Sequence, residues 1–216
     1  MSARSANRSA RSPGGRRLAQ VRAARRRRGL AVMAVVATGG VFALVVLPNL
    51  HHAVQQGPLP LKHSQIIREQ ARDKDLDPAL LAGVIYAESR FRDGQVSAAG
   101  ALGLMQLTPE TARDVARRSG GFAFGINDLG TPKVNISYGA YHLRYLKRRF
   151  DGNTTLVLAA YNAGEGNVAG WLADAAAAQR GFTIDDIPFP ETRAYVQKVL
   201  DARRDYRTQY AAELGL

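Results

Sequence analysis

Glu88 is the carboxylate whose surroundings in the sequence best suit acid–base chemistry. It follows Val84 by four residues and Ile85 by three, so on a helix it shares a face with these apolar side chains. A carboxylate on the buried face of a helix loses hydration, which raises its pKa and lets it carry a proton near neutral pH. A general acid acting on a poor leaving group needs this property. The same pattern also fits a glutamate at a helix end that pairs with Arg90 or Arg92 at the surface.

Two further segments combine small residues with polar side chains. Residues 100–107 read Gly-Ala-Leu-Gly-Leu-Met-Gln-Leu and predict a loop whose backbone can approach a ligand closely beside one amide, that of Gln106. Residues 160–164 read Ala-Tyr-Asn-Ala-Gly and predict a helix end that carries the hydroxyl of Tyr161 and the amide of Asn162. Each segment taken alone is equally typical of an ordinary connection between helices.

Helices are the elements that would hold these residues in place. A capping residue followed by proline marks three helix starts, at Asp77-Pro78, Thr108-Pro109 and Thr131-Pro132. Apolar residues at helical spacing predict further helices over residues 64–74, from residue 153, over residues 167–177 and from residue 190. No segment shows the alternation of polar and apolar residues that is typical of a strand. The pattern therefore predicts an all-α domain over residues 63–216.

The part of the chain before this domain divides into three segments. Residues 1–28 contain ten arginines and no acidic residue, which predicts a disordered tail. Residues 29–47 carry no charge and would form a helix of about 28 Å, close to the thickness of the hydrocarbon core of a bilayer. They predict a transmembrane helix, with a buried core helix as the alternative. Residues 48–62 contain three prolines and predict a linker.

Charge is distributed very unevenly along the chain. The net charge is +12, but outside the arginine-rich tail 20 basic residues face 18 acidic ones, so the domain does not show a uniformly basic surface for nucleic acid. The tail itself could contact nucleic acid or anionic lipid. Residues 25–28 are all arginine and precede the apolar run, which predicts a cytoplasmic N-terminus and an extracytoplasmic domain. A cleavable signal peptide is the alternative, although no small-residue cleavage motif lies near residue 47.

Several chemistries find no support in the residue types. The chain has no cysteine, which excludes disulfides, thiolate metal ligands and a cysteine nucleophile. Its four histidines form no zinc-protease motif, and neither a calcium-binding loop nor a phosphate-binding glycine loop occurs. The sequence therefore predicts no metal site and no cofactor.

Four segments, taken in order, resemble the soluble-lytic-transglycosylase-like (SLT domain) family of peptidoglycan-cleaving enzymes. They are residues 87–91 (Ala-Glu-Ser-Arg-Phe), 97–106 (Ser-Ala-Ala-Gly-Ala-Leu-Gly-Leu-Met-Gln), 160–164 (Ala-Tyr-Asn-Ala-Gly) and 187–196 (Ile-Pro-Phe-Pro-Glu-Thr-Arg-Ala-Tyr-Val). The resemblance extends over about residues 61–210. It implies a lysozyme-like helical fold, preceded here by the single predicted transmembrane helix.

The resemblance implies a role for each matching residue in the first two segments. Glu88 corresponds to the catalytic acid and base of the family. Ser97 corresponds to the serine that steadies the N-acetyl region of the reacting sugar. Met105 and Gln106 belong to the loop that lines the cleft and contacts the saccharide.

The last two segments carry supporting positions. Tyr161 corresponds to the motif tyrosine close to the catalytic glutamate, and Asn162 to an adjacent structural or substrate-binding amide. Glu191 and Tyr195 match the late motif, whose glutamate supports the cleft. Buried hydrogen-bonding roles explain Asn162 and Tyr195 equally well. The acidity of Glu165, next to the third segment, has no explanation in the sequence.

The matched motifs offer one catalytic carboxylate, whereas glycoside hydrolysis usually uses two. The resemblance implies that the substrate supplies the nucleophile, so that cleavage between N-acetylmuramic acid and N-acetylglucosamine forms a 1,6-anhydro ring without water. The expected partners are peptidoglycan glycan strands and, through residues 29–47, the cytoplasmic membrane. Two alternatives stay open: a muramidase that uses water at the same site, and a non-catalytic scaffold of the cell wall or a secretion apparatus.

Overall fold

The computed structural model describes residues 57–121, 124–179 and 181–216. The predicted tail, the predicted transmembrane helix and most of the predicted linker lie outside these residues. Within the described part of the chain, no helix is both long enough and apolar enough to cross a membrane.

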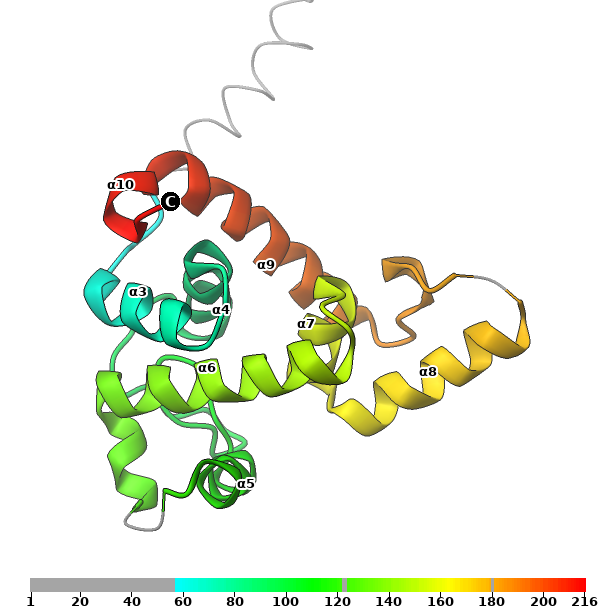
Figure 1. Cartoon of the computed structure of the whole chain (residues 1–216), viewed down its shortest axis with the longest axis horizontal. Helices are drawn as coiled ribbons and strands as arrows, with labels where there is room; N and C mark the ends of the chain where they lie inside the picture. The colour runs from blue at the N-terminus through cyan, green and yellow to red at the C-terminus, as the bar shows by residue number, and fades with distance from the viewer. Residues whose placement is uncertain (1–56, 122–123, 180) are drawn as a thin grey trace, which may run out of the picture. The chain divides into compact units, whose positions relative to one another are not determined.

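Helices joined by loops, the longest of them between α4 and α5, make up the described residues, which confirms the predicted all-α class (Figure 1). Two isolated β-bridges, Val96 with Leu102 and Leu102 with Leu107, are the extended pairing in this part of the chain. The α-helices are α3 (Ser64–Asp73), α4 (Pro78–Ser89), α5 (Pro109–Ser119), α6 (Pro132–Arg149), α7 (Thr154–Ala163), α8 (Glu165–Ala177), α9 (Pro190–Gln209) and α10 (Ala211–Leu214). Two short 3₁₀ helices, η2 (Ile126–Gly130) and η3 (Ile184–Asp186), lie in the connections.

Side-chain caps explain why several helices begin where they do. The carboxylate of Asp77 accepts from the amide of Ala79 at 3.0 Å at the start of α4. The hydroxyl of Thr108 accepts from the amide of Thr111 at 3.1 Å at the start of α5. Thr131 also precedes its helix, but its side chain makes no cap hydrogen bond. The cap-and-proline pattern thus located the starts of α4, α5 and α6.

α8 begins at Glu165, two residues before the predicted start. Gly164 ends α7 and serves at the same time as the N-cap of α8, with φ 89° and ψ 146°. This conformation lies outside the left-handed helical region, so the glycine does not form a Schellman stop. Because only glycine adopts such a conformation readily, it allows a second helix to follow the first without a linker.

α4 forms the centre of the core, between α3 and α9 (Figure 1). Every residue of α4 from Ala79 to Ile85 is buried. Gly83 allows α9 to come close, because a Cβ at this position would lie 3.0 Å from the carbonyl oxygen of Val199. Asp77 adds an ionic link to α9, with its carboxylate 2.5 Å from Arg203. The start and the middle of α4 are therefore fixed against α9, and Glu88 follows in the last turn of the same helix.

The last residues of the predicted linker are attached to α9 and the residue after it. The carbonyl of Pro60 accepts from the hydroxyl of Tyr206 at 2.6 Å, and the carbonyl of Leu59 accepts from the hydroxyl of Tyr210 at 2.5 Å. The amide of Leu59 donates to the side chain of Gln209 at 3.0 Å. The compact unit accordingly runs from Pro58 to Leu216, five residues earlier than the boundary expected from sequence.

Candidate active site

Glu88 lies in the last turn of α4 and is partly buried. Burial raises the pKa of its carboxyl group from an ordinary value of 4.5 to about 7, against the smaller lowering effects of Tyr195 and Lys198. No other carboxylate among the described residues contributes to this pKa. The raised pKa agrees with the expectation from the helical spacing, and no ion pair links Glu88 to Arg90 or Arg92 in this part of the chain.

Tyr195 and Lys198 face Glu88 from α9. The hydroxyl of Tyr195 is buried and makes no hydrogen bond of regular geometry to a described protein atom, yet it lies close enough to lower the pKa of Glu88. The ammonium group of Lys198 donates to the carbonyl of Ala87 at 2.8 Å. Lys198 therefore brings a positive charge near Glu88, while its ammonium group hydrogen-bonds to a backbone carbonyl. The sequence interpretation missed Lys198, although it is one helical turn from Tyr195.

The loop between α4 and α5 carries Ser97 and Gln106. The hydroxyl oxygen of Ser97 accepts from the amide of Ala101 at 3.0 Å, which leaves the hydroxyl proton available to a ligand. The side-chain amide of Gln106 donates to the carbonyl oxygens of Gln95 at 3.1 Å and Gly103 at 2.7 Å. Both predicted residues thus help to close the loop on itself, and the side-chain oxygen of Gln106 stays available as an acceptor.

Met105 has a fully buried side chain, packed beside Gly139 of α6. A Cβ on Gly139 would lie 2.2 Å from the sulfur of Met105, so a glycine is required at this contact. The family resemblance implies that Met105 lines the cleft together with Gln106. In the structure its side chain packs in the core under the loop. Its backbone amide donates to the side chain of Asn135, and its carbonyl accepts from the hydroxyl of Tyr161.

Asn135 is a residue of the site region that the sequence interpretation missed. Its side chain is fully buried, accepts from the amide of Met105 at 2.7 Å, and donates to the carbonyls of Leu102 at 2.9 Å and Leu129 at 3.0 Å. One amide side chain thus satisfies three backbone groups that would otherwise be buried without partners. Its position in the first turn of α6, 30 residues from Met105, gave no local signal.

Tyr161 connects the loop to α7. Its hydroxyl donates to the carbonyl of Met105 at 2.9 Å. Burial, followed by the nearby charge of Glu88, raises the pKa of this phenol well above its ordinary value. Tyr161, Tyr195 and Glu88 therefore form one electrostatically connected group, with the two phenols protonated at all physiological pH values.

The remaining predicted residues lie at the junction of α7 and α9. The side-chain oxygen of Asn162 accepts from the hydroxyl of buried Thr192 at 2.7 Å, which favours a structural role for this amide. Glu191 is exposed in the first turn of α9 and has no hydrogen bond or ion pair with another described residue. Glu165, unexplained by sequence, accepts from the hydroxyl of Tyr145 at 2.8 Å.

This arrangement suits general acid–base catalysis by a single group. A carboxyl group with a pKa of about 7 is partly protonated at neutral pH and can donate a proton, then accept one in a later step. Standard glycoside hydrolysis uses a second carboxylate about 5–10 Å from the first. No second carboxylate of the described residues is among the causes of the pKa shift of Glu88.

Comparisons with known proteins agree on one family. Residues 65–181, more than half of the chain, match the family model described as the transglycosylase SLT domain. The soluble lytic murein transglycosylase of Salmonella typhimurium is 34% identical over 155 residues, which make up 68% of this chain and 23% of that protein. The membrane-bound lytic murein transglycosylase F of Pseudomonas fluorescens is 36% identical over 123 residues, covering 54% of this chain and 23% of that protein.

Solved structures show the same similarity. An inactive mutant of the lytic transglycosylase Slt from Pseudomonas aeruginosa superposes with a TM-score of 0.65 and 35% identity, over 71% of this chain and 25% of that one. The 70 kDa soluble lytic transglycosylase of Escherichia coli gives a TM-score of 0.64 and 31% identity, over 69% of this chain and 25% of that one. The chain thus spans about a quarter of the length of these relatives.

Proposed function

Since the chain belongs to the transglycosylase SLT domain family, we propose that it cleaves the β-1,4 bond between N-acetylmuramic acid and N-acetylglucosamine in peptidoglycan. The products would end in 1,6-anhydromuramic acid, so the reaction is that of a lyase. The observation that carries this proposal is the partly buried carboxyl group of Glu88, whose pKa is raised to about 7 and whose shift has no second described carboxylate among its causes.

In the first step Glu88 protonates the bridging oxygen as the bond from C1 of the muramic acid to that oxygen breaks. Glu88 is then a carboxylate and removes the proton from O6 of the same sugar. The O6 oxygen bonds to C1, closes the anhydro ring and restores the protonated Glu88. Because O6 and C1 belong to one residue, the attack is intramolecular and gains the rate advantage of high effective concentration over water.

We assign the supporting roles from the family resemblance together with the contacts of each residue. Ser97 directs its free hydroxyl proton toward the N-acetyl region of the sugar, and Gln106 offers its side-chain oxygen. Met105 and Tyr161 hold this loop in position by packing and through the hydrogen bond between them. Tyr195 tunes the pKa of the catalytic carboxyl group.

Asn162 and Glu191 complete the assignment at the junction of α7 and α9. Asn162 ties the two helices together through Thr192. Glu191, exposed at the start of α9, is the member of the set whose proposed role in supporting the cleft rests on the family motif alone.

We also propose that residues 29–47 anchor the chain in the cytoplasmic membrane, with residues 1–28 in the cytoplasm and residues 48–62 as the connection to the catalytic domain. The uncharged run and the four arginines before it support this topology. Peptidoglycan lies on the outer side of that membrane, and the proposed orientation places the domain on the same side.

Product analysis tests the proposed reaction. Peptidoglycan digested by the full chain in detergent is analysed by mass spectrometry, before and after borohydride reduction. We expect muropeptides about 18 Da lighter than hydrolysis products and resistant to reduction. Reducible muramic acid ends would show a muramidase instead. If the folded wild-type chain releases no fragments, the enzyme proposal fails in favour of a scaffold.

A further inference from the structure

A separate pocket of about 500 Å³ lies against α6, and none of the residues proposed for the cleavage reaction lines it. We call it the arginine pocket. Its lining consists of four arginines and two tyrosines: Arg118, Tyr141, Arg144, Tyr145, Arg148 and Arg149. Five of these six residues belong to α6, and Arg118 comes from the last turn of α5.

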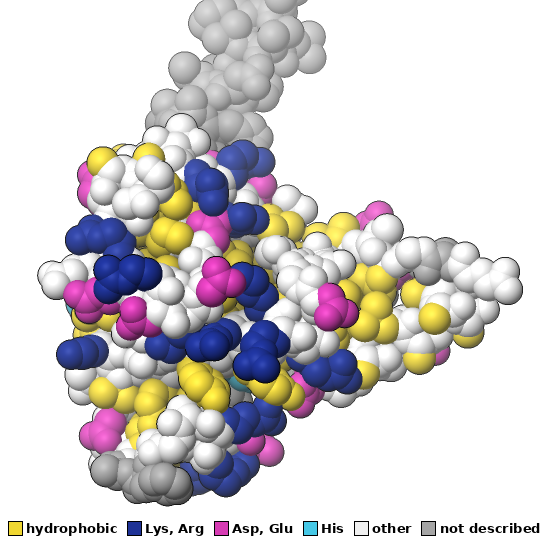
Figure 2. Space-filling model, viewed as in Figure 1, with side chains coloured by type: hydrophobic (Ala, Val, Ile, Leu, Met, Phe, Trp, Pro, Cys, Tyr) yellow, Lys and Arg dark blue, Asp and Glu magenta, His cyan; other side chains and the backbone are white. Residues whose placement is uncertain are grey.

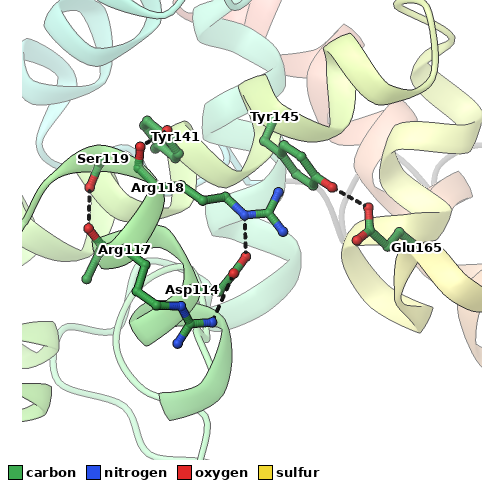
Figure 3. Close-up of polar contacts among 8 residues, drawn as sticks. Asp114, Arg117, Arg118, Ser119, Tyr141, Tyr145 and Glu165 are labelled. Carbon is green, nitrogen blue, oxygen red and sulfur yellow. Dashed lines mark hydrogen bonds and ion pairs between the residues drawn. The ribbon is translucent and has the colours of Figure 1, made fainter.

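One wall of the arginine pocket is held rigidly (Figure 3). The guanidinium of Arg118 lies 3.9 Å from the ring centre of Tyr145 and pairs with Asp114 at 2.8 Å. The hydroxyl of Tyr145 donates to Glu165 of α8 at 2.8 Å, and the hydroxyl of Tyr141 donates to the carbonyl of Arg118 at 2.9 Å. Three helices therefore fix the tyrosine rings and one guanidinium before any ligand arrives.

The other wall carries guanidinium groups that form no ion pair with a described carboxylate, although Asp75 lies near enough to Arg144 for that arginine to help lower the pKa of Asp75. Among the described residues, no carboxylate lies within 4.0 Å of the guanidinium nitrogens of Arg144, Arg148 or Arg149, whereas Arg118 has its partner Asp114. Arg144 and Arg148 are four residues apart on one face of α6, and like charges at this spacing destabilise a helix. Arg148 and Arg149 also suit the negative end of the helix, but Arg144 lies outside the last turn.

Lys and Arg side chains gather on the face of the molecule where α6 runs (Figure 2). The arginine pocket thus offers three guanidinium groups without an ion pair to a described residue, those of Arg144, Arg148 and Arg149, beside aromatic rings. Guanidinium groups bind carboxylates and phosphates through paired hydrogen bonds, and the tyrosine rings add apolar contact area. The chemistry of the pocket therefore fits an anionic ligand with more than one acidic group.

A short chain of rings leads from the arginine pocket to the candidate active site. The ring of Tyr145 lies 6.3 Å from that of His142, and the ring of His142 lies 5.4 Å from that of Tyr161. The charge of Glu88 in turn contributes to the raised pKa of Tyr161. Burial lowers the pKa of His142 to about 4, so this residue is neutral at physiological pH and the positive charge of the region comes from the arginines.

We propose that the arginine pocket is a subsite for the carboxylates of the peptide stems attached to the glycan strand. The proposal rests on the proposed function, because a glycan strand whose muramic acid lies at Glu88 carries peptide stems that end in free carboxylates, and the ring contacts from Tyr145 through His142 to Tyr161 connect the pocket to the site of Glu88. These carboxylates would neutralise Arg144 and Arg148 and would favour peptide-bearing strands over stripped ones.

Kinetics with two substrates test the pocket. The full chain in detergent is assayed on peptide-bearing glycan and on glycan from which an amidase has removed the stems. In Arg144→Gln/Arg148→Gln we expect the ratio of kcat/KM between the two substrates to fall roughly tenfold, mainly through KM, as two charge-assisted contacts are lost. The matched control Lys133→Gln/Arg204→Gln removes the same charge from exposed positions away from the pocket and should keep the wild-type ratio.

Binding to Glu88→Gln separates this proposal from the cleavage reaction. The probes are a free stem tetrapeptide, the same peptide with amidated carboxylates, and a glycerol phosphate oligomer. We expect the free peptide to bind at least about tenfold more tightly than the amidated one, and Arg144→Gln/Arg148→Gln to abolish the difference. Equal binding of both peptides, or binding of the phosphate oligomer alone, overturns the proposal. If the wild-type chain cleaves neither glycan, the proposed function fails. The binding experiment then still shows whether the arginine pocket binds the carboxylates of the stem peptide.

Discussion

Two opposing effects act on the carboxyl group of Glu88, and burial is the stronger. Loss of hydration raises the pKa, while the hydroxyl of Tyr195 and the charge of Lys198 lower it. A direct ion pair would have held the pKa low, but Lys198 donates to the carbonyl of Ala87 instead. The ammonium group therefore moderates the shift without cancelling it. The result, a pKa of about 7, suits a group that must give and then take a proton.

The raised pKa has a cost in stability that can be measured. Between pH 4.5 and about 7 the folded chain holds a proton on Glu88 that the unfolded chain has lost, so stability falls as the pH rises through this range. Glu88→Gln removes the titration. We expect it to match wild type at pH 4 and to exceed it by up to about 3 kcal/mol at pH 8, measured by urea unfolding at both pH values.

The control for this experiment is Glu191→Gln, at an exposed position. It should change the free energy of unfolding by less than about 0.5 kcal/mol at either pH. A wild-type stability equal to that of Glu88→Gln at pH 8 would show that Glu88 is not desolvated in the folded protein.

Among the residues of the candidate site, the sequence alone could identify those that are marked by a pattern within one helix. The spacing of Glu88 from Val84 and Ile85 lies within one helix, so periodicity indicated a position on the buried face, while a surface position paired with arginine fitted the same pattern. Asn135 and Lys198 act through contacts with backbone groups 30 and 111 residues away, and periodicity carries no information about such contacts. The family motif included Met105, but only the structure shows that its side chain is in the core.

The loop between α4 and α5 is positioned by elements that follow it in the chain. Asn135 of α6 binds its backbone at Leu102 and Met105, and Tyr161 of α7 binds the carbonyl of Met105. Gly103 makes the first of these contacts possible, because a Cβ there would lie 2.1 Å from the side-chain nitrogen of Asn135. The loop therefore depends on close packing as well as on its own turns.

Two glycines of this loop provide a matched pair of substitutions. Gly103 and Gly100 have φ values of 76° and 77°, so alanine carries the same backbone strain at each. No atom lies within 4 Å of a Cβ on Gly100, whereas a Cβ on Gly103 collides with Asn135. We expect Gly100→Ala to cost about 1 kcal/mol and Gly103→Ala about 2–4 kcal/mol, with glycan cleavage reduced at least about tenfold only in Gly103→Ala.

Thermal unfolding and initial rates on one glycan preparation measure both effects. Equal losses in the two variants would mean that backbone strain alone governs the loop and that the contact with Asn135 contributes little. Asn135→Leu, which removes the hydrogen bonds without a clash, should resemble Gly103→Ala in activity.

The order and ends of the helices were largely predictable, and the exceptions have physical reasons. Asp77 and Thr108 combine a side-chain cap with a following proline, which is an unambiguous local signal. The start of α8 was misplaced by two residues because Gly164 serves two helices at once, a conformation that a sequence pattern does not distinguish from a simple stop. Glu165 then lies in the first turn of α8, where it meets Tyr145 of α6.

The whole chain combines a compact unit, which we propose to be catalytic, with an N-terminal segment of different composition. The unit Pro58–Leu216 includes residues at its start that hydrogen-bond to Tyr206 and Tyr210. The arginine-rich residues 1–28 and the uncharged residues 29–47 precede it.

Fractionation tests the proposed anchor. We expect the full chain to remain with membranes after extraction at pH 11, and residues 58–216 to be released, because a run of 19 uncharged residues is long enough to span the hydrocarbon core. Replacing Val36 and Val45 by arginine should release the full chain as well. Extraction of the unaltered full chain at pH 11 would contradict the anchor and leave the catalytic unit unaffected.

The pH dependence of kcat/KM for glycan cleavage tests most directly the claim that Glu88 starts the reaction as an acid. The full chain in detergent should keep its highest kcat/KM below pH 7 and lose about tenfold per pH unit above it, because the free enzyme must hold the proton. Tyr195→Phe removes an interaction that lowers the pKa and should move this decline to higher pH. A decline centred near pH 4.5, or a constant kcat/KM up to pH 9, would contradict the account.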